Sequence, residues 1–149
     1  MRSPLSSEAP GAGSMRDVGL LPCTGLRVLE IGESISAAVA GMVLADYGAD
    51  VLVIEPPDGS RLRRAPAFVM WSRGKRDLRL DLTTVEGRER VHELAADSDV
   101  AITALEPATA DRLAVDGATM CARAPRLVHC EVSGFGRGHP LSDRPGYEG

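Results

Sequence analysis

The chain of 149 residues has few cysteines, and none is spaced for a redox or metal site. Cys23, Cys121 and Cys130 form no C-x-x-C pair, and three thiols cannot all pair with one another. The three histidines are equally scattered, so no set of ligands has metal-binding spacing. This usage predicts free thiols, a reducing cytoplasmic location and no bound metal.

Long apolar runs and an excess of positive charge are also missing. The longest apolar candidate, residues 35–45, is well short of the ~18 residues that a membrane-spanning helix needs. Residues 1–19 lack the apolar segment of a secretory signal, so we expect a disordered tail in which Met1 or Met15 is the start. The net charge of −4 argues against a general nucleic-acid binder. We therefore expect neither a membrane nor a nucleic-acid partner.

Between residues 20 and 149, segments with the apolar pattern of a strand alternate with segments that have the apolar pattern of a helix. This alternation predicts one α/β domain. The predicted strands are 26–31, 50–55, 77–82, 99–103 and 127–133, and the predicted helices are 37–47, 83–97, 109–113 and 118–124. Residues 56–75 are expected to form a loop. Right-handed crossovers then give a mostly parallel sheet. Parallel sheets are covered on both faces, and no helix follows the last strand, so we expect a fragment of a larger polypeptide.

Two helix starts carry capping signals. Ser34 or Ser36 is expected to cap the first helix, which Gly48 ends. Thr83, with Glu86 three positions later, is expected to form a capping box at the start of the helix over 83–97.

The turn after the first strand, residues 32–36, lacks the glycines of a dinucleotide fingerprint. Ser34 and Ala37 stand where G-x-G-x-x-G requires glycine. The segment VLEIG, with Glu55 at the end of the next strand, is similar to the first motif of nucleotide-dependent methyltransferases. An S-adenosylmethionine- or NAD-binding α/β enzyme, a phosphate site at the helix start and an ordinary strand-to-helix turn all stay open.

Basic residues concentrate between positions 61 and 79, where Asp77 is the only opposing charge. The members of this basic cluster are Arg61, Arg63, Arg64, Arg73, Lys75, Arg76 and Arg79. Guanidinium groups bind phosphate oxygens in pairs, so the cluster favours a polyanionic small molecule. A solvated basic loop is the alternative. Only Phe68 and Trp71 lie nearby for base stacking, which disfavours nucleic acid.

No group of residues forms a convincing catalytic set. His129 and Cys130 are neighbours on a strand and therefore point to opposite faces. His92 is expected at the surface of a glutamate-rich helix, and His139 lies in a loop. The carboxylates of Glu33, Glu55, Asp143 and Glu148 are the remaining candidates.

Three segments in order resemble the N-terminal part of the class III CoA-transferases, the CaiB/BaiF family that includes formyl-CoA transferase and α-methylacyl-CoA racemase. They are LPCTGLRVLEIGESISAAVAGMVLADYGADVLVIEPP, SRGKRDLRLDLTTVEGRERVHELAADSDVAI and PRLVHCEVSGFGRGHPLSDRPGYEG, and together they span residues 21–149. The resemblance implies a Rossmann-like CoA-binding domain and an interlocked homodimer. It also implies transfer of CoA between carboxylic acids through an aspartyl-CoA intermediate.

The same resemblance places the family's nucleophilic aspartate a few tens of residues past the match to DRPGYEG. That segment ends at Gly149, so the aspartate is expected beyond Gly149. No catalytic residue is therefore assigned among the 149 residues, and we expect this part of the enzyme to be inactive alone.

The resemblance also implies CoA contacts at matching positions. These are Ile35, Ser36, Lys75, Arg76, Leu80, Ala104, Leu105, Arg112, Tyr147 and Glu148. The chain departs from the family pattern at several of these places. Tyr147 stands where racemases carry a histidine, which disfavours racemase chemistry, and Ala104 and Leu105 replace the usual asparagine and phenylalanine. Pro56 stands where some transferases carry an arginine. A non-catalytic CoA-binding module, or one subunit of a split enzyme, is therefore kept as an alternative.

Overall fold

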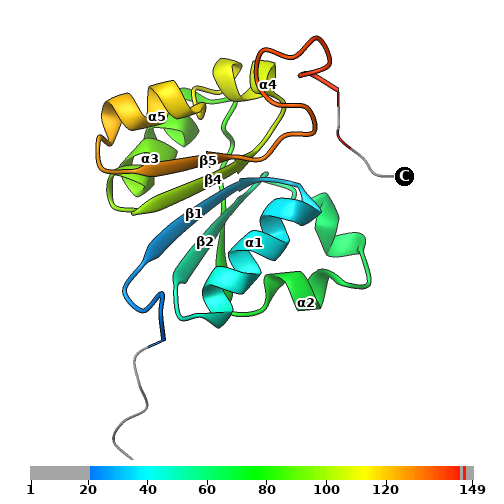
Figure 1. The fold of residues 1–149 in the computed structure, drawn as a ribbon, viewed down its shortest axis with the longest axis vertical. Helices are drawn as coiled ribbons and strands as arrows, with labels where there is room; N and C mark the ends of the chain where they lie inside the picture. The colour runs from blue at the N-terminus through cyan, green and yellow to red at the C-terminus, as the bar shows by residue number, and fades with distance from the viewer. Residues whose placement is uncertain (1–20, 145, 147–149) are drawn as a thin grey trace, which may run out of the picture.

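A five-stranded sheet forms the centre of the protein (Figure 1), in a computed structural model that describes residues 21–144 and 146. The strands are β1 (Arg27–Gly32), β2 (Asp50–Glu55), β3 (Lys75–Arg79), β4 (Val100–Ala104) and β5 (Val128–Glu131). Their order is β3-β2-β1-β4-β5, and every neighbouring pair is parallel. The predicted α/β class with a parallel sheet is confirmed. The predicted tail over 1–19 lies outside the described residues.

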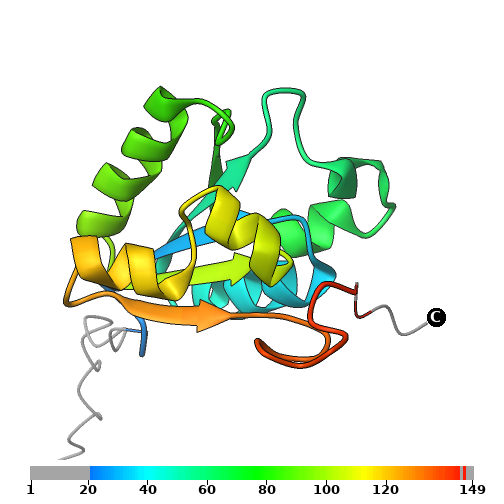
Figure 2. The ribbon, with the colours of Figure 1, turned by 90° about the horizontal axis from the view of Figure 1, so that it is seen from above.

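Helices cover the sheet in two layers, with α1 and α2 on one face and α3, α4 and α5 on the other (Figures 1 and 2). Their bounds are α1 (Ile35–Asp46), α2 (Phe68–Ser72), α3 (Val85–Ala96), α4 (Pro107–Arg112) and α5 (Gly117–Arg123). The prediction of a plain loop over 56–75 is wrong, because this crossover contains the short 3-10 helix η1 (Arg61–Arg64) and α2. α2 has five residues and no side-chain cap, so it leaves little local signal.

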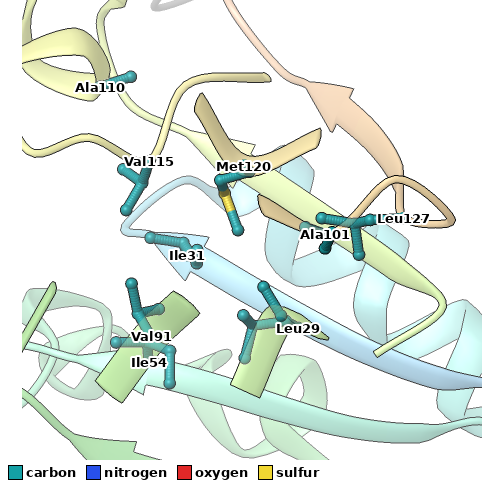
Figure 3. Packing of buried hydrophobic residues seen from close by; sticks show 11 residues of the cluster. Leu29, Ile31, Ile54, Val91, Ala101, Ala110, Val115, Met120 and Leu127 are labelled. Atoms are coloured by element: carbon teal, nitrogen blue, oxygen red, sulfur yellow. The ribbon is translucent and has the colours of Figure 1, made fainter. Parts of the chain in front are cut away.

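The main core lies between the sheet and the layer of α3, α4 and α5. Alternation along β1 sends Leu29 and Ile31 to this side, where they meet Val91 and Met120 from the helices (Figure 3). Val28 and Glu30 point to the opposite side, under α1. Both strand faces are therefore buried, as expected for a central parallel strand.

Small residues hold α1 close to the sheet. Ala37, Ala38 and Gly41 are its buried positions, whereas the larger Val39 and Val43, and Tyr47 just after the helix, are exposed. Gly41 has no room for a side chain, because a Cβ there would lie 2.1 Å from Glu30 Oε2. The side chain of a buried acid thus occupies the space that a larger helix residue would fill.

The helix ends largely follow the sequence signals. Ser34 caps α1, its Oγ accepting a hydrogen bond from Ser36 N, and Gly48 follows α1 at φ +97°. The cap of α3 is Thr84, whose Oγ1 accepts from Gly87 N; the prediction of Thr83 is wrong by one position. Thr83 instead donates its hydroxyl to Asp81 Oδ1.

His92 of α3 is 7% exposed, so its predicted surface position is wrong. Its Nδ1 has no hydrogen-bond partner among the described residues. Burial lowers the pKa of this imidazole below its ordinary 6.5, and the charge of Arg123 adds to the effect, while Glu89 and Asp116 oppose it. The neutral ring is therefore the form that the fold accepts.

We expect the free energy of unfolding to fall as the pH drops below 6.5, because the unfolded chain then binds a proton that folded His92 does not. The slope for one such group is at most about 1.4 kcal/mol per pH unit. Urea denaturation at pH 7.5 and 5.5 measures this loss, which should be smaller in the variant His92→Leu. The exposed His139 gives the matched control, His139→Gln. Equal losses in wild type and His92→Leu contradict the assignment.

Candidate functional site

The strand order creates a crevice at the carboxyl ends of β1 and β4. The chain leaves β1 toward β2 on one side and later returns to place β4 on the other side, and ligands of open α/β sheets bind at such a reversal. Gly32, at the end of β1, has φ +105°, and a Cβ at this position would lie 2.4 Å from Ala104 O of β4. Only glycine allows the two strand ends to approach this closely.

A largely apolar cavity of about 260 Å³ lies at this edge of the sheet; we call it the edge pocket. Its lining residues are Ile31, Gly32, Glu33, Ile54, Glu55, Pro56, Pro57, Leu80, Asp81, Leu82, Thr83, Leu105 and Leu113. They lie at or just after the carboxyl ends of β1, β2, β3 and β4, and Leu113 directly follows α4. A hydrophobic cavity with a few polar groups is typical of sites for cofactors and nucleotides.

The structure brings two of the predicted CoA contacts, Leu80 and Leu105, together in the edge pocket. Arg112 ends α4 beside Leu113; it is exposed and has no ion pair among residues 21–144 and 146. The guanidinium is therefore unpaired in this part of the chain, next in sequence to Leu113 of the pocket lining. Ala104 meets Gly32 through its backbone, as described above.

Ile35 and Ser36 form the first turn of α1, next to the crevice, and both are exposed. The CoA contacts at the matched positions stay predictions.

The end of the chain, residues 147–149, lies outside the described residues. The predicted CoA contacts of Tyr147 and Glu148 therefore stay predictions. So does the expectation that the nucleophilic aspartate lies beyond Gly149, since the described residues end before that point.

Lys75 and Arg76 are placed away from Leu80 and Leu105. They line a second cavity of about 180 Å³ with Ala38 of α1 and Trp71 and Ser72 of α2; we call it the helix-side pocket. The side chain of Lys75 is 3% exposed, and its Nζ donates hydrogen bonds to Glu30 Oε2 and Ala38 O, both at 2.7 Å. Arg76 is exposed and paired with Asp50.

Burial raises the pKa of Glu30, and the hydrogen bond and charge of Lys75 partly oppose the increase. Glu30 was not among the residues predicted from the sequence. A carboxylate in the middle of the apolar run VLEIG was the available signal, since buried charges require a partner.

The basic cluster is much less positive than its sequence suggests, and its interpretation as a patch opposed only by Asp77 is wrong. Five of its seven cations are paired with carboxylates from β1, the β1–α1 loop, α1 and β2. The pairs are Arg61–Glu33, Arg63–Glu55, Arg73–Asp46, Lys75–Glu30 and Arg76–Asp50. Arg64 and Arg79 have no such partner within the described part of the chain.

Among the remaining candidates for catalysis, His129 contacts another side chain of the sheet and Cys130 lies at the surface. His129 Nε2 lies 3.0 Å from Thr103 Oγ1 across the β4–β5 pair, and Cys130 is exposed. Among residues 21–144 and 146, no three His, Cys, Asp or Glu side chains are grouped to hold a metal ion. None of the helices described is long and apolar enough to span a membrane.

Comparison with known proteins identifies clear matches. The sequence model of CoA-transferase family III matches residues 23–149. A probable fatty acyl-CoA transferase of Mycobacterium tuberculosis is 30% identical over an alignment of 138 residues, which covers 85% of this chain and 35% of the relative. A succinate–glutarate CoA-transferase of Agrobacterium fabrum is 33% identical over 143 residues, covering 85% of this chain and 36% of the relative.

A crystal structure of a CaiB/BaiF family protein from Brucella suis has the same fold. It superposes with a TM-score of 0.79 at 34% identity, over 85% of this chain and 37% of that protein. The chain thus spans about a third of the length of the relatives that it matches.

Proposed function

Because the chain belongs to CoA-transferase family III, we propose that it is the CoA-binding part of an enzyme that moves CoA between carboxylic acids. The observation that carries this proposal is the edge pocket, an apolar cavity at the reversal of strand order. The relatives described above are named as CoA-transferases, which supports the same reaction class.

The proposed ligand is the nucleotide end of CoA or of an acyl-CoA substrate. Its base would occupy the edge pocket against Leu80 and Leu105, and a phosphate would lie within reach of Arg112. Ile35 and Ser36 would border the phosphates through the first turn of α1. Charge-assisted hydrogen bonds from a guanidinium to phosphate are among the strongest contacts that such a site can offer.

For the reaction, we propose covalent catalysis by an aspartate. Its carboxylate attacks the donor thioester and releases CoA, which leaves a mixed anhydride; the CoA thiolate then re-attacks to give an aspartyl-CoA thioester and the free acid. The acceptor carboxylate then attacks the aspartyl-CoA thioester and releases the CoA thiolate, which leaves a second mixed anhydride. The thiolate attacks the acceptor's carbonyl carbon in this anhydride, which gives the new acyl-CoA and restores the aspartate. We propose that this aspartate lies beyond Gly149, where the family resemblance places it. We further propose a cytoplasmic, interlocked homodimer for the complete enzyme.

A non-catalytic CoA-binding module, or one subunit of a split enzyme, is supported by the three carboxylates that line the edge pocket. Glu33 and Glu55 are held in ion pairs with Arg61 and Arg63, and Asp81 accepts two hydrogen bonds from Thr83, so all three are poorly placed to act as nucleophiles. Both readings predict no transfer when the chain alone is mixed with donor thioester and acceptor acid, so the sequence downstream of Gly149 separates them: an aspartate in a Gly-Asp turn favours the enzyme, and a stop codon favours the module. Transfer of CoA by this chain alone would contradict the proposal that the nucleophile lies outside these 149 residues.

Replacing Arg112 with alanine is expected to weaken CoA binding by about 1.5–3 kcal/mol, or roughly 10- to 150-fold in Kd, since one charge-assisted contact to phosphate is lost. Isothermal titration calorimetry measures the change. Arg126→Ala is the matched control, because Arg126 is also exposed but precedes β5, at the amino ends of the strands. Equal affinities for Arg112→Ala and wild type contradict the proposed phosphate contact.

A further inference from the structure

Lys75 connects the two sides of the loop that borders the edge pocket. It comes from β3, an edge strand, and its ammonium crosses under α1 to reach β1. One hydrogen bond, to Glu30, holds the strand two residues before Gly32; the other, to Ala38 O, holds the first turn of α1. The loop of residues 32–34 lies between these two attachment points.

The surroundings of Lys75 suit this connection better than direct contact with a phosphate. The side chain of Lys75 is 3% exposed, the charge of its ammonium is matched by Glu30, and it does not line the edge pocket. Residues alternate along β3, so Lys75 faces α1, whereas Leu78 and Leu80 pack toward the core under α3. Gly41 leaves the space that the ion pair fills.

We propose that Lys75 is a positioning residue, which fixes the loop of residues 32–36 for the CoA phosphates without touching the ligand. This inference rests on the proposed function for the identity of the ligand. Whether Lys75 fixes the loop can be tested in the absence of CoA. The loop amides must hold one arrangement if they are to bind an anion without a large ordering cost. Two hydrogen bonds from one buried ammonium provide that constraint.

The test uses the full chain with Glu30→Met and Lys75→Met together, because this double variant leaves no buried charge unpaired. Hydrogen exchange is measured at the amides of residues 35–38, with α3 as the internal reference. We expect about tenfold faster exchange at these amides alone, the effect of losing one hydrogen bond to a charged group. The single variant Lys75→Met provides a second case, and circular dichroism establishes whether each variant folds.

CoA affinity at low and high salt then separates positioning from contact. We expect the double variant to bind CoA about tenfold more weakly at both salt concentrations, with the salt dependence of wild type. Arg112→Ala, which removes a proposed direct ion pair, should instead show a reduced salt dependence, because salt screens exposed charge pairs.

Two results overturn the inference. One is a reduced salt dependence in the double variant, which makes Lys75 a ligand; the other is unchanged exchange at residues 35–38. If wild-type protein does not bind CoA, the proposed function fails, and the exchange measurement still decides whether Lys75 fixes the loop.

Discussion

Substitution of Gly32 by alanine is expected to destabilise the protein by about 3 kcal/mol, the sum of two costs. A non-glycine residue at positive φ costs about 1–2 kcal/mol, and forcing a methyl group into filled space costs about 1–3 kcal/mol. Both apply here, because Gly32 has φ +105° and its Cβ would lie 2.4 Å from Ala104 O. Urea denaturation with a fixed m-value measures the change. CoA affinity should also fall, since β1 and β4 must separate at the crevice.

Gly25→Ala is the control that isolates the steric part. Gly25 also has a positive φ, +88°, but a Cβ there would meet nothing within 4 Å. We therefore expect Gly25→Ala to cost only the conformational term of about 1–2 kcal/mol. Equal losses for the two variants contradict the close approach of β1 and β4.

Replacing Lys75 with methionine is expected to cost about 3–5 kcal/mol, because it leaves the carboxyl of Glu30 buried without its partner. Losses of this size approach the whole stability of a small domain, about 5–15 kcal/mol. Arg76→Met is the matched control: its ion pair with Asp50 is exposed, so about 1 kcal/mol or less is expected. Denaturation of the two variants at pH 7 gives the comparison.

The free energy of unfolding of Lys75→Met is expected to change with pH in a defined direction. Burial already raises the pKa of Glu30, and loss of Lys75 removes the effect that opposes the increase. Folded Glu30 then holds its proton where the unfolded chain has released it, so stability falls as the pH rises above 4.5 through the folded pKa. The variant should therefore recover part of its loss as the pH is lowered toward 5. A deficit that does not change with pH contradicts an unpaired carboxylate as its cause.

The sequence predicted the sheet well because strands carry local signals. Each predicted strand overlaps an observed one, and glycine and serine marked the ends of α1 correctly. The order of the strands has no local signal, since it depends on which side of β1 the chain returns to after α3. Without that order, the edge pocket at the carboxyl ends of the strands could not be located.

The ion pairs, like the strand order, could not be predicted from local signals in the sequence. Within residues 61–79 only Asp77 is acidic, yet Arg61, Arg73 and Lys75 find carboxylates 27 to 45 positions earlier in the chain. Counting charges along the sequence therefore overestimated the positive potential of this segment. Leu80 and Leu105 were placed at one site by the family resemblance, and the pocket that contains both was visible only in three dimensions.

The central claim is that the edge pocket binds the nucleotide end of CoA, and NMR chemical-shift mapping of the labelled full chain tests it most directly. We expect saturable shifts on adding CoA at Leu80, Leu82, Leu105 and Leu113, with no such response to S-adenosylmethionine or NAD. Absence of shifts at millimolar CoA in the folded protein would contradict it. So would shifts confined to the helix-side pocket around Trp71 and Ser72.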